Sequence, residues 1–462
     1  MKKQHALVKN QDVELTVDNM SHEGLGVARL EGLAVFVQGA LPGETVKARI
    51  IKAASSYAVA RVLEFLSTSP ERQEPFCPVY RRCGGCSLQH MNYAETLRFK
   101  RQVVQDSLER LGGFKGVEIK PVIGMDHPFR YRNKAQYPVG MVDGKLVAGF
   151  YARRSHDIVD ASACGIQHPS SEKVRAAVLG WAKDSKVPLY DEETGEGILR
   201  HIVVRVGFAT GEVLAMIVAA KNRLPHAEKL VSRLRGQVPG LVGIVLNVNP
   251  EAGNAVLGDE NFILYGSPIL EDKLCGMTFE ISPLSFFQVN PDQTEVLYRK
   301  AIDAAGLTGT ETVFDLYCGI GTIALAAAGK AARVIGVEAV EEAVETAVEN
   351  AKRNKVGNAE FHAGAAEDVV PRLYAEGVKA DVVIVDPPRK GCDEKLLATI
   401  LDMKPERIVY VSCNPSTLAR DLRLLSGDSE AETGGYRVVT VQPVDMFPWT
   451  EHVECVVKLE KR

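Results

Sequence analysis

The segment TVFDLYCGIGT, residues 312–322, joins a short apolar run to a glycine-rich turn. The run predicts a buried strand, and Gly319 and Gly321 let the backbone approach a ligand closely before a helix begins. A dinucleotide site prefers G-x-G-x-x-G, whereas this turn reads G-I-G-T-I-A. Glu338 ends the next apolar run, where a carboxylate can accept hydrogen bonds from both ribose hydroxyls. These features predict a nucleoside ligand such as S-adenosylmethionine, and a glycine-rich turn without a ligand is the alternative.

The last third of the chain alternates strand-like and helix-like segments. The strand-like runs are TVFDL, ARVIGVEA, AEFHAG, DVVIV and RIVYV, and a hairpin closes the chain. This alternation requires a parallel sheet with helices on both faces and ligands at the carboxyl ends of the strands. We therefore expect residues 281–462 to form a doubly wound, Rossmann-like α/β domain.

Asp386 follows the run DVVIV and precedes two prolines and Arg389. Because proline cannot continue a β-ladder, the strand must end here, and we expect Asp386 to face the ligand crevice. A loop cap is the competing interpretation. It explains the prolines, but it does not explain why the acid shares a sheet edge with the glycine-rich turn.

Cys413 follows the run RIVYV and precedes Asn414-Pro415. A buried structural cysteine is the commoner fate of this residue type, but the adjacent crevice favours a nucleophile. Carbon 5 of uracil accepts an electrophilic methyl group only after a thiolate adds to C6, and a base must then remove the C5 proton. Glu454 is the candidate base, because burial beside the run CVV would raise its pKa. An exposed edge-strand glutamate is an equal alternative.

Residues 1–66 contain short alternating runs broken by glycines, which predict a small OB-like antiparallel barrel. Residues 67–75 have the composition of a linker. Strand-like runs dominate most of residues 67–280, and we expect a mixed, mostly β central domain there.

Residues 93–112 have apolar positions at helical spacing and stop at a Gly-Gly pair. We expect this helix to present Arg98, Lys100 and Arg101 on one exposed face.

Three cysteines lie within ten residues, Cys77, Cys83 and Cys86, and the last two form a C-x-x-C pair. In a chain without a secretion signal this spacing indicates a thiolate-ligated metal. Cys164 is the best fourth ligand, because the remaining five cysteines all follow residue 274. Zinc and a [4Fe-4S] cluster both accept four cysteines, and the spacing does not separate them.

Residues 129–137, FRYRNKAQY, interleave basic and aromatic side chains. Such a run can pair with phosphates and stack on the bases of single-stranded or looped RNA. A solvated, charged strand is the competing interpretation and, for this segment alone, the favoured one.

The composition limits the function classes further. The formal net charge is −4, which excludes nucleic-acid binding through bulk positive charge and leaves local patches. Without a signal sequence or an apolar stretch of roughly 18 residues, we expect a cytoplasmic monomer with no membrane contact.

With these residues in view, the chain resembles the RNA (uracil-5-)-methyltransferase family over nearly its whole length. It is most similar to the 23S ribosomal RNA enzymes that carry a TRAM domain and an iron-sulfur cluster. The motifs are SFFQVNP at 285–291, DLYCGIGT, DPPRKG, SCNP and DMFPWTEHVE. The resemblance implies methylation of a uracil in 23S ribosomal RNA. It also implies a class I methyltransferase domain, and it makes residues 1–66 a TRAM barrel.

The resemblance also implies residue roles. It places S-adenosylmethionine on Gln288, Tyr317, Glu338 and Asp386, the nucleophile on Cys413 and the base on Glu454. It makes Cys77, Cys83, Cys86 and Cys164 the ligands of a [4Fe-4S] cluster. Phe286 resembles a ring that contacts the substrate, and Arg132 an RNA-contacting arginine. It suggests, finally, that the helix at 93–112 packs with the catalytic domain.

The chain departs from its relatives at two places. Gly364-Ala365-Ala366 stands where some relatives carry a further polar ligand-binding residue, and Trp449 stands where some have histidine. Two other functions compete with ribosomal RNA methylation: a transfer RNA uracil-5 methyltransferase, and an RNA-binding assembly factor without catalysis. The barrel and the cysteines favour ribosomal RNA, and the intact set of acids with Cys413 favours catalysis.

Overall fold

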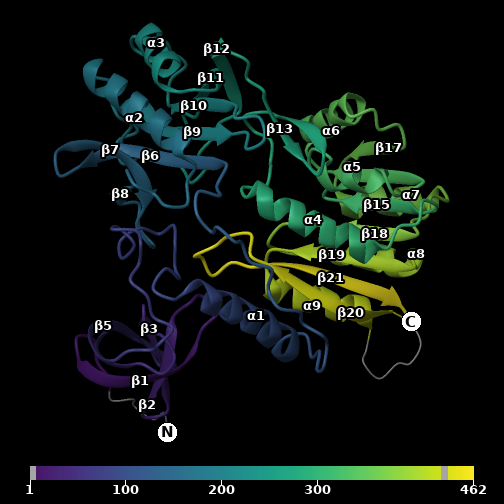
Figure 1. The fold of residues 1–462 in the computed structure, drawn as a ribbon, viewed down its shortest axis with the longest axis horizontal. Coiled ribbons are helices and arrows are strands. Elements are labelled where there is room, and N and C mark those ends of the chain that lie inside the picture. Colours follow the sequence, from purple (N-terminus) through teal and green to yellow (C-terminus); the bar gives the residue numbers. More distant parts are fainter. Residues whose placement is uncertain (1–6, 428–434) are drawn as a thin grey trace.

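The computed structural model describes residues 7–427 and 435–462, and three parts surround the middle of the molecule (Figure 1). Residues 1–6 of the expected first domain lie outside the described residues. Within the described ranges, no helix is both long enough and apolar enough to cross a membrane.

The first part is a closed five-stranded barrel with the strand order β1-β2-β3-β5-β4. Alternate residues of its strands point inward, and small or branched apolar side chains such as Val35, Ala48 and Ile50 fill the interior. The expected barrel is therefore present, but it is not wholly antiparallel, because β3 and β5 pair in parallel. Its strands are β1 (Asp12–Met20), β2 (Gly26–Leu30), β3 (Leu33–Gln38), β4 (Thr45–Ala53) and β5 (Tyr57–Ser67).

The second part is a seven-stranded sheet in the order β12-β11-β10-β9-β6-β7-β8. Every residue of β9 and β10 is buried, including Arg200, His201 and Arg205 of β9, because both faces of the sheet are covered. Its elements are β6 (Lys134–Val142), β7 (Lys145–Tyr151), β8 (Ile158–Asp160), α2 (Pro169–Asp184), β9 (Leu199–Val206), β10 (Val213–Ala219), α3 (Ala227–Gln237), β11 (Leu241–Val248) and β12 (Glu260–Gly266).

The third part is a second seven-stranded sheet in the order β17-β16-β15-β18-β19-β21-β20. Strands β15 to β19 are parallel, and β21 joins β19 in antiparallel orientation. The strands are β15 (Thr312–Leu316), β16 (Arg333–Glu338), β17 (Ala359–Ala363), β18 (Val382–Val385), β19 (Arg407–Ser412), β20 (Tyr436–Val444) and β21 (Glu454–Lys461).

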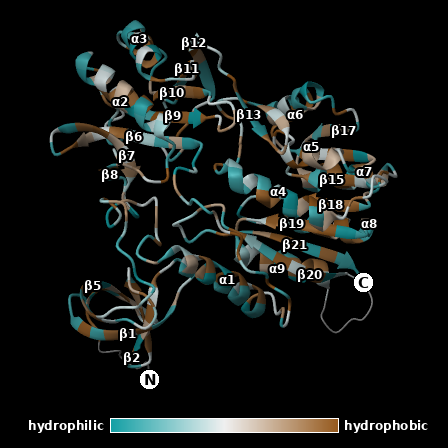
Figure 2. Cartoon of the chain, in the orientation of Figure 1, coloured by the Kyte–Doolittle hydropathy of each residue, from teal (hydrophilic) through white to brown (hydrophobic). Residues whose placement is uncertain are grey.

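Helices cover both faces of this third sheet, because its strands contribute buried apolar residues to the cores on both sides. Figure 2 shows the hydrophobic colouring of these strands. Residues of α4, α5 and α6 pack on one face, and residues of α1, α7, α8 and α9 pack on the other. The helices are α1 (Tyr93–Arg110), α4 (Pro291–Ala305), α5 (Thr322–Ala328), α6 (Glu341–Arg353), α7 (Ala366–Ala375), α8 (Glu394–Met403) and α9 (Pro415–Ser426).

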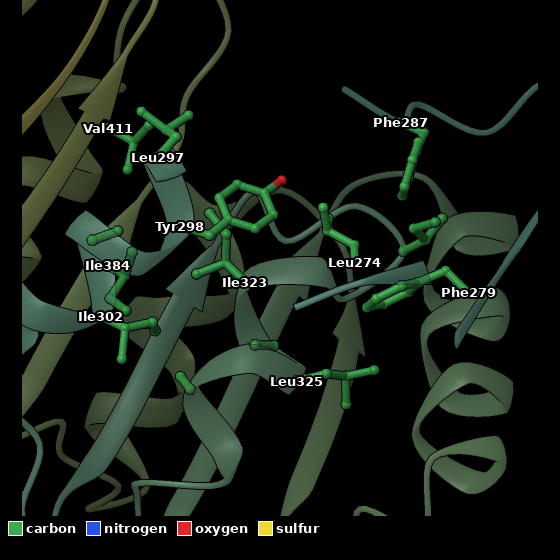
Figure 3. Packing of buried hydrophobic residues seen from close by; sticks show 14 of the residues in the cluster. Leu274, Phe279, Phe287, Leu297, Tyr298, Ile302, Ile323, Leu325, Ile384 and Val411 are labelled. Atoms are coloured by element: carbon green, nitrogen blue, oxygen red, sulfur yellow. The ribbon is translucent and has the colours of Figure 1, made fainter. Parts of the chain in front are cut away.

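The second and third parts share one hydrophobic core. Val203, Met216 and Val245 of the central sheet pack in the same cluster as Leu297 of α4 and Ile323 of α5. The hairpin of β13 (Leu270–Leu274) and β14 (Met277–Ile281) also belongs to this core, and Figure 3 shows its Leu274 and Phe279 side chains. The boundary expected at residue 281 therefore cuts off a hairpin that packs with the third part.

Helix α1 packs against α9 and β20 although it precedes them by some three hundred residues. Val104 and Leu108 enter the core under the third sheet. The expected exposed basic face is wrong for Lys100, whose side chain is fully buried beside Asp445. The sequence could not predict this, because the partner of Lys100 lies at the other end of the chain. Arg98 and Arg101 are exposed as expected, and the Arg101 guanidinium donates to the carbonyl of Ile119.

Candidate active site

The carboxyl ends of β15, β16, β18 and β19 open into a crevice of about 1140 Å³. Asp386 and Cys413, each directly after its strand, line this crevice together with Glu454 at the start of β21. Gln288, Tyr317 and Glu338 also line it. The six residues expected to bind the cofactor or perform catalysis thus share one cavity.

The glycine-rich turn is held against Glu338. One carboxylate oxygen of Glu338 accepts a hydrogen bond from Gly319 N at 3.0 Å, and the other accepts one from Val340 N at 3.0 Å. Tyr317 and Gly321 adopt positive φ angles of 67° and 84° at the turn. A carboxylate fixed at a strand end in this way is suited to bind a ribose.

The strand register places Cys413 and Glu454 next to each other. Ser412 pairs with Cys455 in the antiparallel ladder of β19 and β21. Cys413, which follows Ser412, therefore lies opposite Glu454, which precedes Cys455, at the edge of the crevice. Asn414 caps α9 by accepting a hydrogen bond from Ser416 N, and Pro415 occupies the first helical turn. Cys413 is therefore held between the end of a strand and the start of a helix.

The pKa values of two acids and of the Cys413 thiol in the crevice are raised. Burial raises the pKa of Asp386. Burial and the charge of Asp386 raise the pKa of Glu454, and Arg389 partly opposes this effect. Burial and the two carboxylates raise the pKa of the Cys413 thiol to about 11, again opposed by Arg389. Perturbed acid, base and thiol groups in one crevice are typical of an active site.

Arg389 and His452 are residues to which the sequence assigned no role. Arg389 lines the crevice and lies 3.4 Å from His452 through its guanidinium nitrogen. Asn414 and Thr417 both donate to the carbonyl of Arg389, so α9 fixes the loop that carries it. The only sequence signal for a role of these two residues was their position within motifs, Arg389 in DPPRKG and His452 in DMFPWTEHVE.

Asp315 is a further buried acid of the same sheet edge. Neither of its carboxylate oxygens has a hydrogen-bond partner among the described residues, and burial raises its pKa well above the usual value. The segment Gly364-Ala365-Ala366 borders the crevice through both alanines, with Glu367 beside them.

The four clustered cysteines line a second cavity of about 540 Å³. All four are free thiols. Burial raises the pKa of Cys86 to about 12, and the nearby Cys164, Cys83 and Cys77 add to the shift. Across the described ranges, no three or more His, Cys, Asp or Glu side chains are grouped so that they could hold a metal ion.

The cysteine cavity and the crevice lie next to each other and share part of their lining. Phe286, Phe287, Arg389, Phe447 and His452 line both of them. Phe286 lies at this junction and is 71% exposed. Among the large hydrophobic residues that the structure describes, it has the highest exposed fraction. Arg132 lines the cysteine cavity.

Trp449 joins two segments. One is the cysteine loop, residues 77–88, which carries Cys77, Cys83 and Cys86, and the other leads to Glu454. The carbonyl of Trp449 accepts hydrogen bonds from Ser87 N and Leu88 N, both at 3.0 Å. Its indole donates to the carbonyl of Pro128 at 2.7 Å and packs edge-on against Phe76. The tryptophan is thus a buried anchor, which gives a structural reason for a residue that the sequence left unexplained.

The basic and aromatic run at 129–137 divides between two environments. Tyr131 and Tyr137 are buried in the protein interior, so they cannot stack on bases. Arg132, Lys134 and Gln136 line the cysteine cavity instead. The expected interleaving of stacking and charged groups is therefore wrong for these two tyrosines.

Comparison with known protein families agrees with this architecture. Residues 270–462 match the family described as tRNA (Uracil-5-)-methyltransferase, and residues 8–63 match the TRAM domain. An uncharacterized RNA methyltransferase of Halalkalibacterium halodurans is 51% identical over 461 residues, which cover 100% of this chain and 99% of that protein. Another, from Caldanaerobacter subterraneus, is 50% identical and covers 97% of this chain and 98% of that protein.

One solved structure resembles nearly the whole chain. It is the tRNA (uracil-54, C5)-methyltransferase of Pyrococcus abyssi in complex with S-adenosyl-L-homocysteine, with 28% identity and a TM-score of 0.77. The match covers 97% of this chain and 100% of that one. The similarity therefore extends through the barrel as well as both sheets.

Proposed function

This chain belongs to the RNA (uracil-5-)-methyltransferase family, and on that premise we propose that it methylates C5 of a uracil in 23S ribosomal RNA. The observation that carries the proposal is the crevice shared by Cys413, Glu454 and Asp386, with Glu338 and the glycine-rich turn at its other side. A nucleophile, a raised-pKa base and a nucleoside site meet there, as this reaction requires.

Each side chain has a distinct step in the proposed reaction. The target uridine turns out of its stack into the crevice. The thiolate of Cys413 would then form a bond to C6, and the resulting electron density at C5 would form a bond to the methyl group of the donor while the methyl–sulfur bond breaks, its electrons staying on the sulfur of the departing S-adenosylhomocysteine. Glu454 removes the C5 proton, the electrons of that C–H bond restore the C5–C6 double bond, and the thiolate of Cys413 leaves.

S-adenosylmethionine, when bound, supplies the electrophilic methyl group. Glu338 is placed to accept hydrogen bonds from its ribose, and Gln288, Tyr317 and Asp386 are its other proposed contacts. Phe286 and Arg132 are proposed to contact the RNA, because Phe286 lines both cavities and Arg132 lines the cysteine cavity beside the crevice.

We propose a [4Fe-4S] cluster on Cys77, Cys83, Cys86 and Cys164, with zinc as the alternative. Four thiols around one cavity are a donor set that suits iron and sulfide. Anaerobically purified protein should be brown and absorb broadly near about 400 nm. Stoichiometric zinc without iron would reverse the assignment.

Trapping with 5-fluorouracil tests the catalytic proposal. RNA with this base at the target should form a covalent adduct, because fluorine cannot leave as the proton does. Cys413→Ala should abolish both the adduct and methyl transfer, whereas Cys275→Ala, outside the crevice, should keep both. Methylation by the Cys413→Ala variant would refute the mechanism. Failure to bind S-adenosylmethionine in calorimetry would favour an assembly factor instead.

Transfer RNA is the second candidate substrate. The full-length similarity to a transfer RNA enzyme means that the barrel does not separate the two substrates. What supports ribosomal RNA is the cysteine loop shared with the ribosomal enzymes that the sequence resembles. Methylating purified ribosomal and transfer RNA side by side, then mapping the modified uracil, decides between them.

A further inference from the structure

The strand order gives the Cys413 crevice two ends. Cys413 follows β19 and Asp386 follows β18, on one side of the central strand β15, whereas Glu338 ends β16 on the other side. A methyl donor must place its sulfonium near the uracil that Cys413 attacks, while Glu338 holds its ribose. We therefore expect the base of this nucleoside to lie beyond Glu338, toward the next strand outward, β17, and the start of α7.

The segment between β17 and α7 forms the wall of the crevice at this end. Gly364 N donates to the backbone carbonyl of Glu338 at 2.9 Å, so the segment lies directly beside the acid that is placed to bind the ribose. Ala365, Ala366 and Glu367 all line the crevice. Because alanine has no polar side-chain atom, Glu367 is the one residue of these three whose side chain can hydrogen-bond the edge of a base.

The carboxylate of Glu367 is free to accept a hydrogen bond from a ligand. Among the described residues it has no hydrogen-bond donor and no ion pair, and the nearby Lys395 bonds Asp368 instead, at 2.7 Å. Glu367 is half-buried, and after burial and Cys392 its charge is the next cause that raises the pKa of Tyr317, which also lines the crevice. A half-buried carboxylate beside a nucleoside site favours a ligand that supplies a donor.

Two other acids line the crevice near the start of α8. Asp393 caps this helix, because one of its carboxylate oxygens accepts a hydrogen bond from Lys395 N at 2.9 Å. Glu394 is exposed, so water solvates its carboxylate without a ligand. Neither residue follows β17, and Glu394 therefore serves as a matched control for the loss of one negative charge in the lining of the crevice.

The chemistry of the purine edge identifies what Glu367 can select. The 6-amino group of adenine donates hydrogen bonds, whereas the 6-oxo group of guanine or hypoxanthine accepts them. An ionised carboxylate is an acceptor only. Glu367 can therefore bond the 6-amino group and would repel a 6-oxo group at the same position.

We propose that Glu367 accepts a hydrogen bond from the 6-amino group of the adenine of S-adenosylmethionine and so selects adenine over 6-oxopurines. This inference rests on the proposed function for the identity of the ligand as S-adenosylmethionine. It makes Glu367 a specificity-determining residue of the cofactor site, with no part in the transfer of the methyl group. It also supplies a polar contact next to Gly364-Ala365-Ala366, which has no polar side chain.

Calorimetry of the full-length protein with S-adenosylhomocysteine and with S-inosylhomocysteine, which carries a 6-oxo group in place of the 6-amino group, tests the proposal. Wild type should bind the adenosyl compound at least about tenfold more tightly, as loss of a hydrogen bond to a charged group predicts. Glu367→Gln can donate to the 6-oxo group through its amide nitrogen. It should therefore bind S-inosylhomocysteine more tightly than wild type does, and the preference for adenine should fall by about tenfold. Glu394→Gln should keep the wild-type preference.

The ratio of the two affinities separates base recognition from a structural role. A general loosening of α7 in Glu367→Gln would weaken both ligands equally and leave the ratio unchanged, and that result would overturn the proposal. A change of the ratio in Glu394→Gln as large as in Glu367→Gln would overturn it as well. If wild type methylates RNA while Glu367→Gln keeps the wild-type ratio, only this inference fails. If the ratio changes as expected but wild type methylates no RNA, only the proposed function fails.

Discussion

Lys100 donates a hydrogen bond to Asp445 Oδ1 at 2.5 Å, and both side chains are fully buried. The other carboxylate oxygen of Asp445 accepts from the hydroxyl of Tyr93 at 2.8 Å, and Lys100 also donates to the carbonyl of Phe447. Helix α1 therefore holds the start of the segment that ends in the candidate base Glu454.

Removing one member of this pair should be strongly destabilising. Lys100→Met leaves the charge of Asp445 buried without a partner, which costs about 3–5 kcal/mol, so the melting temperature should fall by several degrees. The double variant Lys100→Met/Asp445→Leu should be more stable than either single variant, because no charge is stranded. Exposed Lys115→Met is the matched control. A double variant less stable than both single variants would contradict this account.

The pH dependence of methylation should depend on Arg389. Glu454 must be ionised to accept a proton, and its raised pKa predicts a rate that increases with pH above the usual carboxylate range of about 4. Arg389 lowers the pKa values of Glu454 and Cys413, so Arg389→Gln should move this increase to higher pH. Arg372→Gln, on exposed α7 surface, should leave the profile in place. A shift of the Arg389→Gln profile to lower pH would contradict the predicted effect of Arg389 on these pKa values.

Cofactor binding should depend on Glu338. Glu338→Gln replaces a charged acceptor with a neutral amide, so affinity for S-adenosylhomocysteine should fall roughly ten- to a hundredfold in calorimetry. Exposed Glu345→Gln on α6 tests whether any loss of negative charge has this effect. Equal affinities for the two variants would remove Glu338 from the proposed site.

The cysteine loop should stabilise the segment that carries the base. Ser87 Oγ donates to Glu451 at 2.5 Å, and Ser87 N donates to the carbonyl of Trp449. Ser87→Ala should therefore accelerate amide hydrogen exchange in residues 449–454, because local opening loses a hydrogen bond to a charged group, about 1.5–3 kcal/mol. Ser232→Ala on the exposed side of α3 is the control. Unchanged exchange in this segment would argue against the coupling.

Much of the catalytic crevice could be predicted from local sequence. Asp386 and Cys413 each follow an apolar run and precede proline within a few residues, and parallel strands bring such ends to one edge of a sheet. The glycine-rich turn and Glu338 follow the same rule. The roles of these residues came from chemistry and family resemblance, because strand position alone equally allowed a buried cysteine and a loop cap.

Only the tertiary structure decided the contacts between distant segments. Lys100 has the spacing of an exposed helical residue, yet its partner Asp445 lies at the far end of the chain. The central sheet and α4 share a core that no local boundary signal marks. Lys134 opposes Arg205 through a strand pairing that periodicity does not specify.

The sequence by itself thus determined the barrel, the doubly wound sheet and the chemical groups at its carboxyl edge, because these follow from residue periodicity and from where strands must end. The structure decided that the cysteine cavity and the crevice share part of their lining, and that Trp449 holds the segment after Cys86 against the segment that leads to Glu454. The physical reason is that burial and pairing across hundreds of residues depend on three-dimensional packing, which local patterns do not encode.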